Sequence, residues 1–437
     1  MLTDRLPLAP LAPPRRDGHE RPSVRQLLEA QAITTHFQPI FSVRQKSVVG
    51  MEALSRGIGP DGRIIPPLTL FADAVAERLS GELEDRCRRT AVRKFAGIES
   101  RSDDLLLFLN LDLAGACDHE ALPAELNAMV RAANLQPRNV ALEFLESRLE
   151  DVARFGELAS RLRQEGFLVV LDDVGAGHSN LDRIPLFRPD IIKIDRGLIS
   201  GVSRDFYKQE TLKSLVSLSR RIGALVVAEG IESEAEAIVA LELGVDLLQG
   251  YFLARPQAAM TVDDRARASA GLDSLAHNFK SHMVAEINGR KNQSRDFNLI
   301  QDRLLRELTK VRAPEFGAVL SAAIGALPQV ECVYVLDDTG NQVTDTVSNE
   351  GGVRRRNAGI FRPAPQGTDH SLKEYFYILA DLELRKYTTD SYVSLASGNL
   401  CRTISGAFRD VTNDRLYVLC LDISSQPSSA GRSTNPS

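Results

Sequence analysis

Acidic and amide side chains recur along the N-terminal part of the chain, and most of them stand at the end of a short apolar run. The runs VVGMEAL, LLLFLNLD, VALEFLE, FLVVLDDVG, IIKID, LVVAEGIE and LLQGYF contain, in chain order, Glu52, Asn110, Glu143, Glu146, Asp172, Asp173, Lys193, Asp195, Glu229, Glu232 and Gln249. A single carboxylate at a strand end is most often a surface charge or a helix cap. Five carboxylates and an asparagine at one point would repel one another unless a cation lay among them. If the fold brings these ends together, the sequence predicts a cation site.

The apolar runs that carry these residues are separated by helix-length segments, which is typical of parallel strands in βα units. Eight candidate strands are present: FQPIF at Phe37–Phe41 and the seven runs above. Gly166 and Gly223 follow two of the amphipathic segments, where a helix C-terminal glycine belongs. The pattern predicts an α/β fold with a parallel sheet. Polar residues at the carboxyl ends of such strands gather at one face of a barrel.

The start of this barrel should be irregular. Only the segment SVRQKS separates Phe41 from Val48, whereas a parallel crossover needs about a dozen residues or more. The first two strands are therefore predicted to pair as an antiparallel hairpin, in an irregular TIM-type barrel.

Composition narrows the class of protein. The chain has 437 residues, enough for two or three domains, with 43% hydrophobic and 25% charged residues, as in an ordinary globular protein. A net charge of −5 implies no general polyanion-binding surface, so no nucleic-acid partner is expected. No apolar run approaches the ~18 residues of a membrane span. The five cysteines are scattered without CxxC spacing, which indicates a reducing cytoplasm, buried small side chains and no structural zinc.

The pattern changes along the chain predict five segments. We expect a disordered leader over 1–24, the barrel over 25–260, a helical connector over 261–329, a β-rich α+β domain over 330–423 and a disordered tail over 424–437. Within the connector, SLAHNFKSHMVAEI and FNLIQDRLLRELTKV carry apolar residues at helical spacing. This segment is charged and heptad-like, so it is also a candidate for pairing between subunits.

The motifs of the first domain resemble those of the EAL family of cyclic di-GMP phosphodiesterases. The signature stands as Glu52-Ala53-Leu54-Ser55-Arg56, and the other motifs follow in family order as FQPI, LNLD, LEFLES, DDVGAGHSNL, KID, AEGIE and QGYFLARP. The resemblance covers slightly more than half of the chain, and no GG[DE]EF segment of a companion cyclase is present. It implies metal-dependent hydrolysis of cyclic di-GMP to linear pGpG. The alternative is a receptor that binds the dinucleotide and cuts it weakly or not at all; such members lose ligand positions, and none is missing here.

The resemblance also implies a role for each residue. Two Mg²⁺ or Mn²⁺ ions, which Ca²⁺ would replace as an inhibitor, are held by Glu52, Asn110, Glu143 and Asp172 on one side and by Asp172, Asp173 and Glu229 on the other. Lys193 orients the attacking water and Glu229 accepts its proton. Substrate contacts are implied for Gln38, Arg56, Gln249 and Glu232, the last on the guanine side. Glu146 is implied to brace the loop after Asp173.

Three points follow from the residues around the aspartate pair. Adjacent residues of a strand point to opposite faces, so Asp172 and Asp173 can share the site only if the chain turns there, and Gly175 and Gly177 allow that turn. A Schiff-base role for Lys193 would need a lowered pKa, whereas surrounding carboxylates would raise it. Val174 stands where the family commonly has phenylalanine, so we expect less packing area to anchor the loop.

The C-terminal domain has the strand pattern of a PAS-like or Cache-like sensor and no catalytic signature. Its first segment, VECVYVLDDTGNQVTDTV, predicts a strand, a turn and a second strand. Tyr375, Tyr377, Tyr392 and Arg402 are either the lining of a pocket for an unknown small-molecule or protein signal, or ordinary half-buried strand residues. We expect this domain to regulate the barrel in a homodimer.

Overall fold

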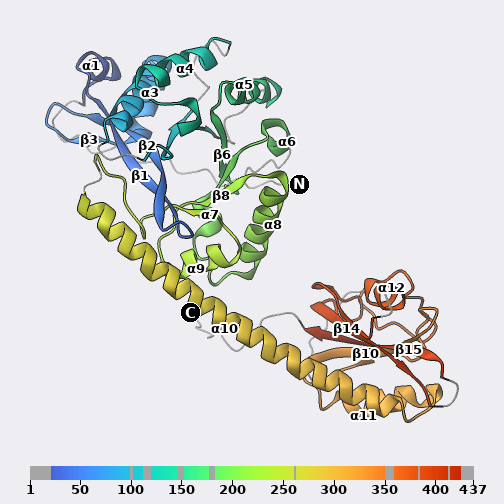
Figure 1. Cartoon of the computed structure of the whole chain (residues 1–437). Coiled ribbons are helices and arrows are strands. Elements are labelled where there is room, and N and C mark those ends of the chain that lie inside the picture. Colours follow the sequence, from blue (N-terminus) through green and yellow to red (C-terminus); the bar gives the residue numbers. More distant parts are fainter. Residues whose placement is uncertain are drawn as a thin grey trace, which may run out of the picture. The chain divides into compact units, whose positions relative to one another are not determined.

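A computed structural model describes residues 21–98, 102–111, 120–145, 152–176, 183–259, 262–349, 359–381, 384–411 and 414–424. These residues form two compact units that divide between Val284 and Ala285 (Figure 1). Most of the expected leader and tail lies outside the described residues. The two units are taken in turn below.

The first unit is a closed barrel of eight strands in the described part of the chain. The strands are β1 (Ile33–Ser42), β2 (Ser47–Ile58), β4 (Leu106–Asn110), β5 (Val140–Leu145), β6 (Leu168–Val174), β7 (Ile191–Ile194), β8 (Leu225–Ala228) and β9 (Leu247–Leu248). Their order is β1-β9-β8-β7-β6-β5-β4-β2, and β1 pairs with β2 to close the ring. All neighbours from β2 to β9 are parallel, whereas β1 is antiparallel to both of its neighbours, with Gln38 opposite Glu52. The predicted hairpin and irregular barrel are confirmed. A short strand β3 (Ile64–Ile65) extends the edge of β2.

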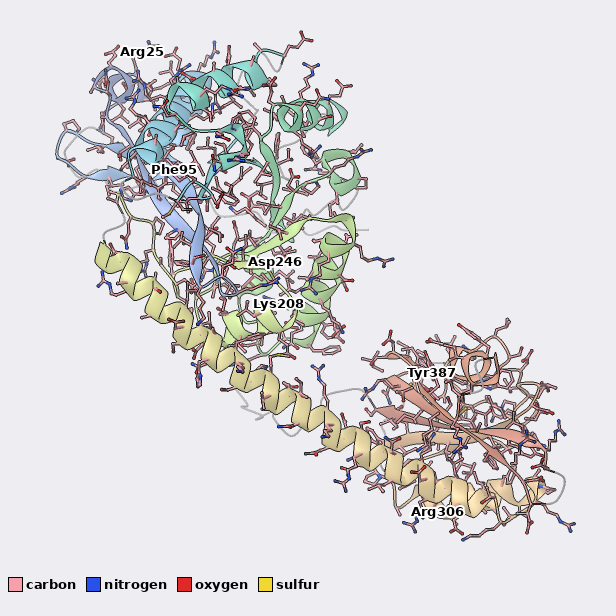
Figure 2. The ribbon with its side chains drawn as sticks, viewed as in Figure 1. Arg25, Phe95, Lys208, Asp246, Arg306 and Tyr387 are labelled. Atoms are coloured by element: carbon pink, nitrogen blue, oxygen red, sulfur yellow. The ribbon has the colours of Figure 1, made fainter. Side chains whose placement is uncertain are left out.

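Helices surround this barrel (Figure 1). They are α1 (Val24–Glu29), α2 (Pro67–Ala76), α3 (Ser80–Ala96), α4 (Leu122–Ala132), α5 (Val152–Gln164), α6 (Arg183–Phe187), α7 (Arg196–Ile199), α8 (Phe206–Ile222) and α9 (Glu234–Glu242), with a 3₁₀ turn at Pro137–Asn139. The amphipathic pattern explains their packing. Phe95 of α3, labelled in Figure 2, is fully buried and its ring meets Phe37 of β1 edge to face. Gly223 has a φ of 85° at the C-cap of α8, as the sequence predicts for a glycine at that position.

The inside of the barrel is filled by one layer of apolar side chains. The layer contains Ile40, Phe108, Ala141, Val170, Ile191, Val227 and Leu247. On β2 the corresponding position is Gly50, because a Cβ there would lie 2.5 Å from Cε2 of Phe108. The Phe108 ring therefore occupies the space that a β2 side chain would otherwise take.

The second unit is an antiparallel sheet with helices on both faces. Its strands are β10 (Val330–Asp337), β11 (Val347–Ser348), β12 (Lys386–Thr388), β13 (Tyr392–Val393), β14 (Leu400–Arg409) and β15 (Leu416–Ser424), in the order β11-β10-β15-β14-β12 with β13 beside β14. One face packs on α11 (Phe316–Ile324) and the end of α10, with a 3₁₀ turn at Ala313–Glu315 between them. The other face packs on α12 (Glu374–Asp381).

Helix α10 (Val262–Leu308) belongs to both units. Leu272 and Leu275 near its start are buried in the core of the barrel unit. Leu304 and Leu308 near its end are buried in the core of the second unit. Within the described residues, no helix is both long enough and apolar enough to cross a membrane.

Candidate active site

One geometric rule places the polar side chains at the carboxyl ends of the strands. Residues two apart in a strand face the same side, so each apolar residue of the interior layer is followed two positions later by a residue at the barrel mouth. The pairs on β5 to β9 are Ala141 and Glu143, Val170 and Asp172, Ile191 and Lys193, Val227 and Glu229, and Leu247 and Gln249. The rule also holds for Phe108 and Asn110 on β4 and for Gly50 and Glu52 on β2. Because β1 runs antiparallel, its mouth residue Gln38 comes two positions before the interior residue Ile40. These eight predicted residues are therefore brought to one mouth.

Lys193 is the centre of this cluster. Its side chain is 1% exposed, and Nζ lies 2.6 Å from Oε1 of Glu143 and against Oε1 of Glu229. Oε2 of Glu52 and Oδ1 of Asp172 lie at 3.5 and 3.6 Å. Nε2 of Gln249 donates to Oε2 of Glu52 at 2.5 Å, which holds that carboxylate in place.

The aspartate pair shares the site because the strand is irregular there. The pairing of β6 with β7 shifts between Leu171 and Val174, and Asp173 adopts a left-handed φ of 58°. Oxygen atoms of Asp172, Asp173 and Glu229 all lie within 4.8 Å of one another. The turn occurs at Asp173 and at Gly175, whose φ is 100°; Gly177 lies outside the described residues. Asp173 itself takes much of the turn, which the glycine argument did not anticipate, although aspartate tolerates this conformation better than most residues.

Val174 lies in strand β6, whereas the sequence analysis placed it in the loop after the aspartate pair. It is the last residue of β6 and is 1% exposed within the apolar core outside the barrel. Its carbonyl accepts from the backbone N–H of Asp195 at 3.0 Å. Valine therefore fills a strand position in the core.

Burial shifts the pKa values of the carboxyl groups. Burial raises the pKa of Glu143, of Glu229 and of Asp172, while Lys193 opposes the rise in each case. Burial, followed by the charges of Asp172 and Asp195, raises the pKa of Asp173 to about 6. Burial alone would lower the pKa of Lys193, but the surrounding carboxylates together raise it well above its ordinary value. A neutral amine for Schiff-base chemistry is therefore disfavoured.

The donor set fits divalent cations. Among the described residues, four carboxylates approach one ammonium group and that of Asp173 lies beside two of them, so the site has excess negative charge. Oε2 of Glu143 is buried and accepts no hydrogen bond from any described residue. Hard divalent ions prefer carboxylate and amide oxygens, and such ions would supply the missing positive charge.

Two of the residues implied to contact substrate donate to backbone carbonyls. Nε2 of Gln38 donates to the carbonyl of Ala254 at 3.2 Å, and Nη1 of Arg56 donates to the carbonyl of Ser55 at 2.8 Å. Burial lowers the pKa of Arg56.

Glu232 carries an interaction that the sequence reasoning missed. Its carboxylate pairs with Nη2 of Arg196 at 2.9 Å, and both side chains are about half exposed. Arg196 lies against Gly230, where a Cβ would come within 2.5 Å of Cγ of Arg196 and where φ is 64°. The glycine of the AEGIE motif, Gly230, was the feature of the sequence that could have indicated this close approach. Glu146 lies outside the described residues, so its bracing role is not placed.

The four candidate pocket residues of the second unit are not brought together. Tyr375 and Tyr377 belong to α12 and are not strand residues; Tyr375 packs with Tyr392 of β13 between this helix and the sheet, whereas Tyr377 is 43% exposed. Arg402 is adjacent to Cys401 and Thr403 on β14 and pairs with Ile423, so it faces the opposite side. The prediction that these four residues line one pocket is therefore wrong.

Comparison with known proteins gives the family. The EAL domain model matches residues 21–256, and the chain belongs to this family. The EAL-domain protein YkuI of Bacillus subtilis is 28% identical over 380 residues, covering 85% of this chain and 91% of its own length. The crystal structure of YkuI, described as in complex with substrate c-di-GMP and calcium, superposes with a TM-score of 0.76 at 25% identity and covers 93% of this chain and all of that one. A probable cyclic di-GMP phosphodiesterase of Escherichia coli, PdeN, is 27% identical over 255 residues, covering 58% of this chain and 48% of its own length.

Proposed function

We propose that this protein is a metal-dependent phosphodiesterase that opens cyclic di-GMP to linear pGpG. The observation that carries the proposal is the buried Lys193 surrounded by the carboxylates of Glu52, Glu143, Asp172 and Glu229. Support also comes from the relatives, since PdeN is named a probable cyclic di-GMP phosphodiesterase and YkuI was crystallised with c-di-GMP and calcium.

The chain's own residues have distinct tasks in this proposal. Two Mg²⁺ or Mn²⁺ ions, held by Glu52, Asn110, Glu143, Asp172, Asp173 and Glu229, would neutralise the phosphate and lower the pKa of water. The Lys193 ammonium, fixed by Glu143, donates a hydrogen bond that orients the attacking water. Glu229 lies against the same ammonium and accepts the proton.

The remaining polar residues hold the substrate. The guanidinium of Arg56 suits a phosphate oxygen. The amides of Gln38 and Gln249 lie on β1 and just after the neighbouring strand β9, where they contact the bound dinucleotide. Glu232 faces a guanine from the loop after β8.

The alternative function is a receptor that binds cyclic di-GMP without cutting it. This reading is weaker because the acidic, amide and lysine positions are all retained, and because the described ones converge on one mouth. Purified protein with cyclic di-GMP and Mn²⁺ should yield pGpG. Tight binding with no pGpG over many hours would support the receptor instead.

We further propose that the second unit is a PAS-like sensor which regulates the barrel in a homodimer. Its antiparallel sheet with α12 on one face has the layout of such a module, and it joins the barrel through the continuous helix α10. The boundaries we propose remain 25–260 for the barrel, 261–329 for the helical segment and 330–423 for the sensor, with the start of the helical segment packed in the core of the barrel unit.

A further inference from the structure

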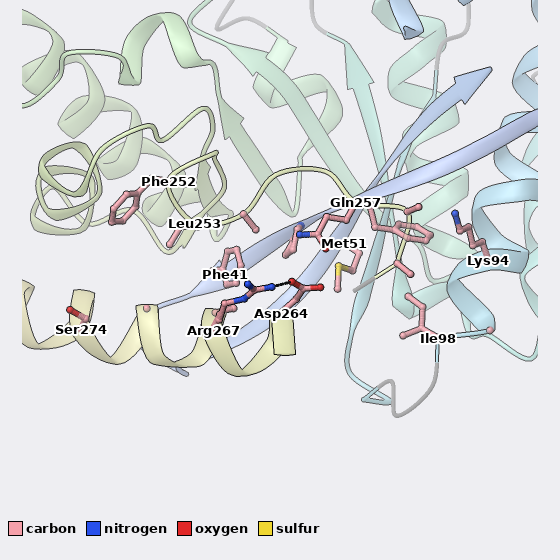
Figure 3. A pocket seen from close by; sticks show the side chains of 18 of the residues that line it. Phe41, Met51, Lys94, Ile98, Phe252, Leu253, Gln257, Asp264, Arg267 and Ser274 are labelled. Atoms are coloured by element: carbon pink, nitrogen blue, oxygen red, sulfur yellow. Dashed lines mark hydrogen bonds and ion pairs between the residues drawn. The ribbon is translucent and has the colours of Figure 1, made fainter. Parts of the chain in front are cut away.

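A large cavity lies on the outer side of the barrel wall formed by β1 and β2. Its volume is about 1000 Å³. One wall is the outer face of the hairpin, with Phe37, Pro39, Phe41 and Met51; the opposite wall is the start of α10, with Ala268 and Gly271. Figure 3 shows Phe41 and Met51 between the hairpin and this helix. The cavity lies within the barrel unit.

This cavity is separate from the active site. In β1 the side chains of Phe37, Pro39 and Phe41 alternate with those of Gln38 and Ile40, which point into the barrel. The two sites therefore lie on opposite faces of the same two strands, and nothing in the proposed hydrolysis uses the outer one.

The lining is mostly apolar. Phe37, Phe41 and Met51 are only 6%, 1% and 3% exposed, although they border the cavity. Leu253 and Ile98 add further apolar surface. Such a volume and such walls are those of a site for a small apolar or amphipathic molecule.

The charged groups of the lining differ in their interaction partners. Arg267 is paired with Asp264 at 2.5 Å (Figure 3), and Glu234 accepts from Nδ2 of Asn278 at 2.7 Å. Lys94, at one end of the cavity in Figure 3, has no carboxylate partner among the described residues. Its Nζ donates to the carbonyl of Thr35 at 2.7 Å and to Oγ1 of Thr34 at 3.4 Å. An ammonium has three donors, so one donor and the positive charge remain for a ligand.

We propose that this cavity binds an amphipathic carboxylate of the fatty-acid class, with its alkyl chain against Phe37, Phe41 and Met51 and its carboxylate on Lys94. The apolar walls exclude a highly polar ligand, because its polar groups would lose their hydrogen bonds with water. Among the described residues of the lining, Lys94 is the cation without a carboxylate partner, so it is the group that would receive an anionic end.

The test is direct binding to the full chain, which does not depend on the hydrolytic function. Decanoate and dodecanoate, each below its micelle-forming concentration, are titrated by calorimetry with dodecanol as the neutral counterpart. We expect saturable one-to-one binding that tightens about fourfold for each added methylene. Absence of saturable binding to the wild-type chain overturns the proposal.

A matched pair of variants tests the location. A Cβ at Gly271 and at Gly289 meets nothing within 4 Å, and both glycines lie in α10, but only Gly271 lines the cavity. Gly271→Phe should abolish dodecanoate binding, whereas Gly289→Phe should leave it unchanged. Both replace a helix glycine in open space, so neither should prevent folding. Equal binding by the two variants overturns the site.

A second pair tests the carboxylate end. Lys94→Gln should weaken dodecanoate about tenfold, as expected for the loss of a charge-assisted hydrogen bond. The same change should leave dodecanol unaffected, and Lys94→Arg should restore dodecanoate binding. If dodecanol binds wild-type protein as tightly as dodecanoate, the site takes a neutral amphiphile and the proposed head-group contact is overturned.

Discussion

Nζ of Lys193 lies 2.6 Å from Oε1 of Glu143, and both side chains are almost completely buried at the carboxyl end of the barrel. This ion pair is part of a cluster in which negative charges outnumber positive ones, because three further carboxylates approach the same ammonium. Removing the ammonium would leave several buried carboxylates without the cation that contacts them. The charge balance of the cluster therefore links hydrolysis to both metal binding and stability.

Hydrolysis should require a divalent cation. Excess chelator should abolish pGpG formation, and Mn²⁺ or Mg²⁺ should restore it. Ca²⁺ should inhibit, because it is larger and accepts irregular coordination. Product is followed by chromatography, and full activity in excess chelator would contradict the two-metal proposal.

Glu52→Ala should stop turnover without unfolding the barrel. Loss of one carboxylate removes a proposed metal ligand but also relieves repulsion with the other acids of the site. The melting temperature of the metal-free variant should equal or exceed that of wild type. Glu29→Ala, at an exposed glutamate of α1, is the control for loss of a glutamate elsewhere.

Lys193→Ala should lower kcat about a hundredfold or more, the usual scale for a positioned proton-transfer or orienting group. Because the variant leaves buried carboxylates unpaired, we also expect the metal-free protein to lose about 3–5 kcal/mol of stability. Mn²⁺ should restore much of that stability but not the turnover. Lys213→Ala, at an exposed lysine of α8, is the control. Unchanged kcat in Lys193→Ala would refute the water-orienting role.

Buried Asp422 should make the second unit less stable as pH rises. Burial raises the pKa of Asp422, although Thr403, Cys332 and Tyr392 donate to its carboxylate. The folded state then binds the proton more tightly than the unfolded state, whose pKa is about 3.9. Stability is therefore greatest below that pKa and decreases as pH rises through the folded pKa.

Asp422→Asn should reduce this slope, and the remainder is expected from Glu331, whose pKa is also raised by burial. Calorimetry of wild type and variant from pH 4 to pH 8 measures the slope, and the variant should melt higher at neutral pH. Asp338→Asn, at an exposed turn residue, should leave the slope unchanged. A melting temperature of wild type that rises across this range, with no effect of Asp422→Asn, would contradict the prediction.

The two units should be separable only within α10. A chain ending at Met260 loses Leu272 and Leu275 from the barrel core, and each buried leucine lost costs about 2–5 kcal/mol. A chain ending at Val284 keeps both and should retain hydrolysis. If the second unit regulates the barrel, the chain ending at Val284 should differ from the full chain in turnover or in sedimentation. Identical rates and masses would leave the regulatory proposal without support.

The sequence predicted the barrel well because its signals were local. Alternating strands placed Glu52, Glu143, Asp172 and Glu229 at one mouth, and the short SVRQKS segment forced the antiparallel start. Contacts between distant segments were not predictable in this way. The bond from Gln249 to Glu52 joins residues 197 positions apart. Arg402 was misplaced because an irregular β-rich segment does not fix which face a strand residue takes until its register is known.

The Gly50 and Phe108 pair has a consequence for how this barrel can vary among relatives. The Phe108 ring fills the space of two interior positions, so Gly50→Val alone should cost about 1–3 kcal/mol through overpacking. Phe108→Ala alone should cost about 3–5 kcal/mol through the void it leaves. The double variant should lose less stability than the sum of the two single variants, because the valine at 50 occupies part of the space that the Phe108 ring leaves. The two positions are thus expected to evolve together: a side chain larger than glycine at 50 should be found only beside a residue smaller than phenylalanine at 108. Sequence changes in the interior layer would then occur as compensated pairs. The carboxylates two residues farther along each strand would keep their spacing even though the interior residues differ.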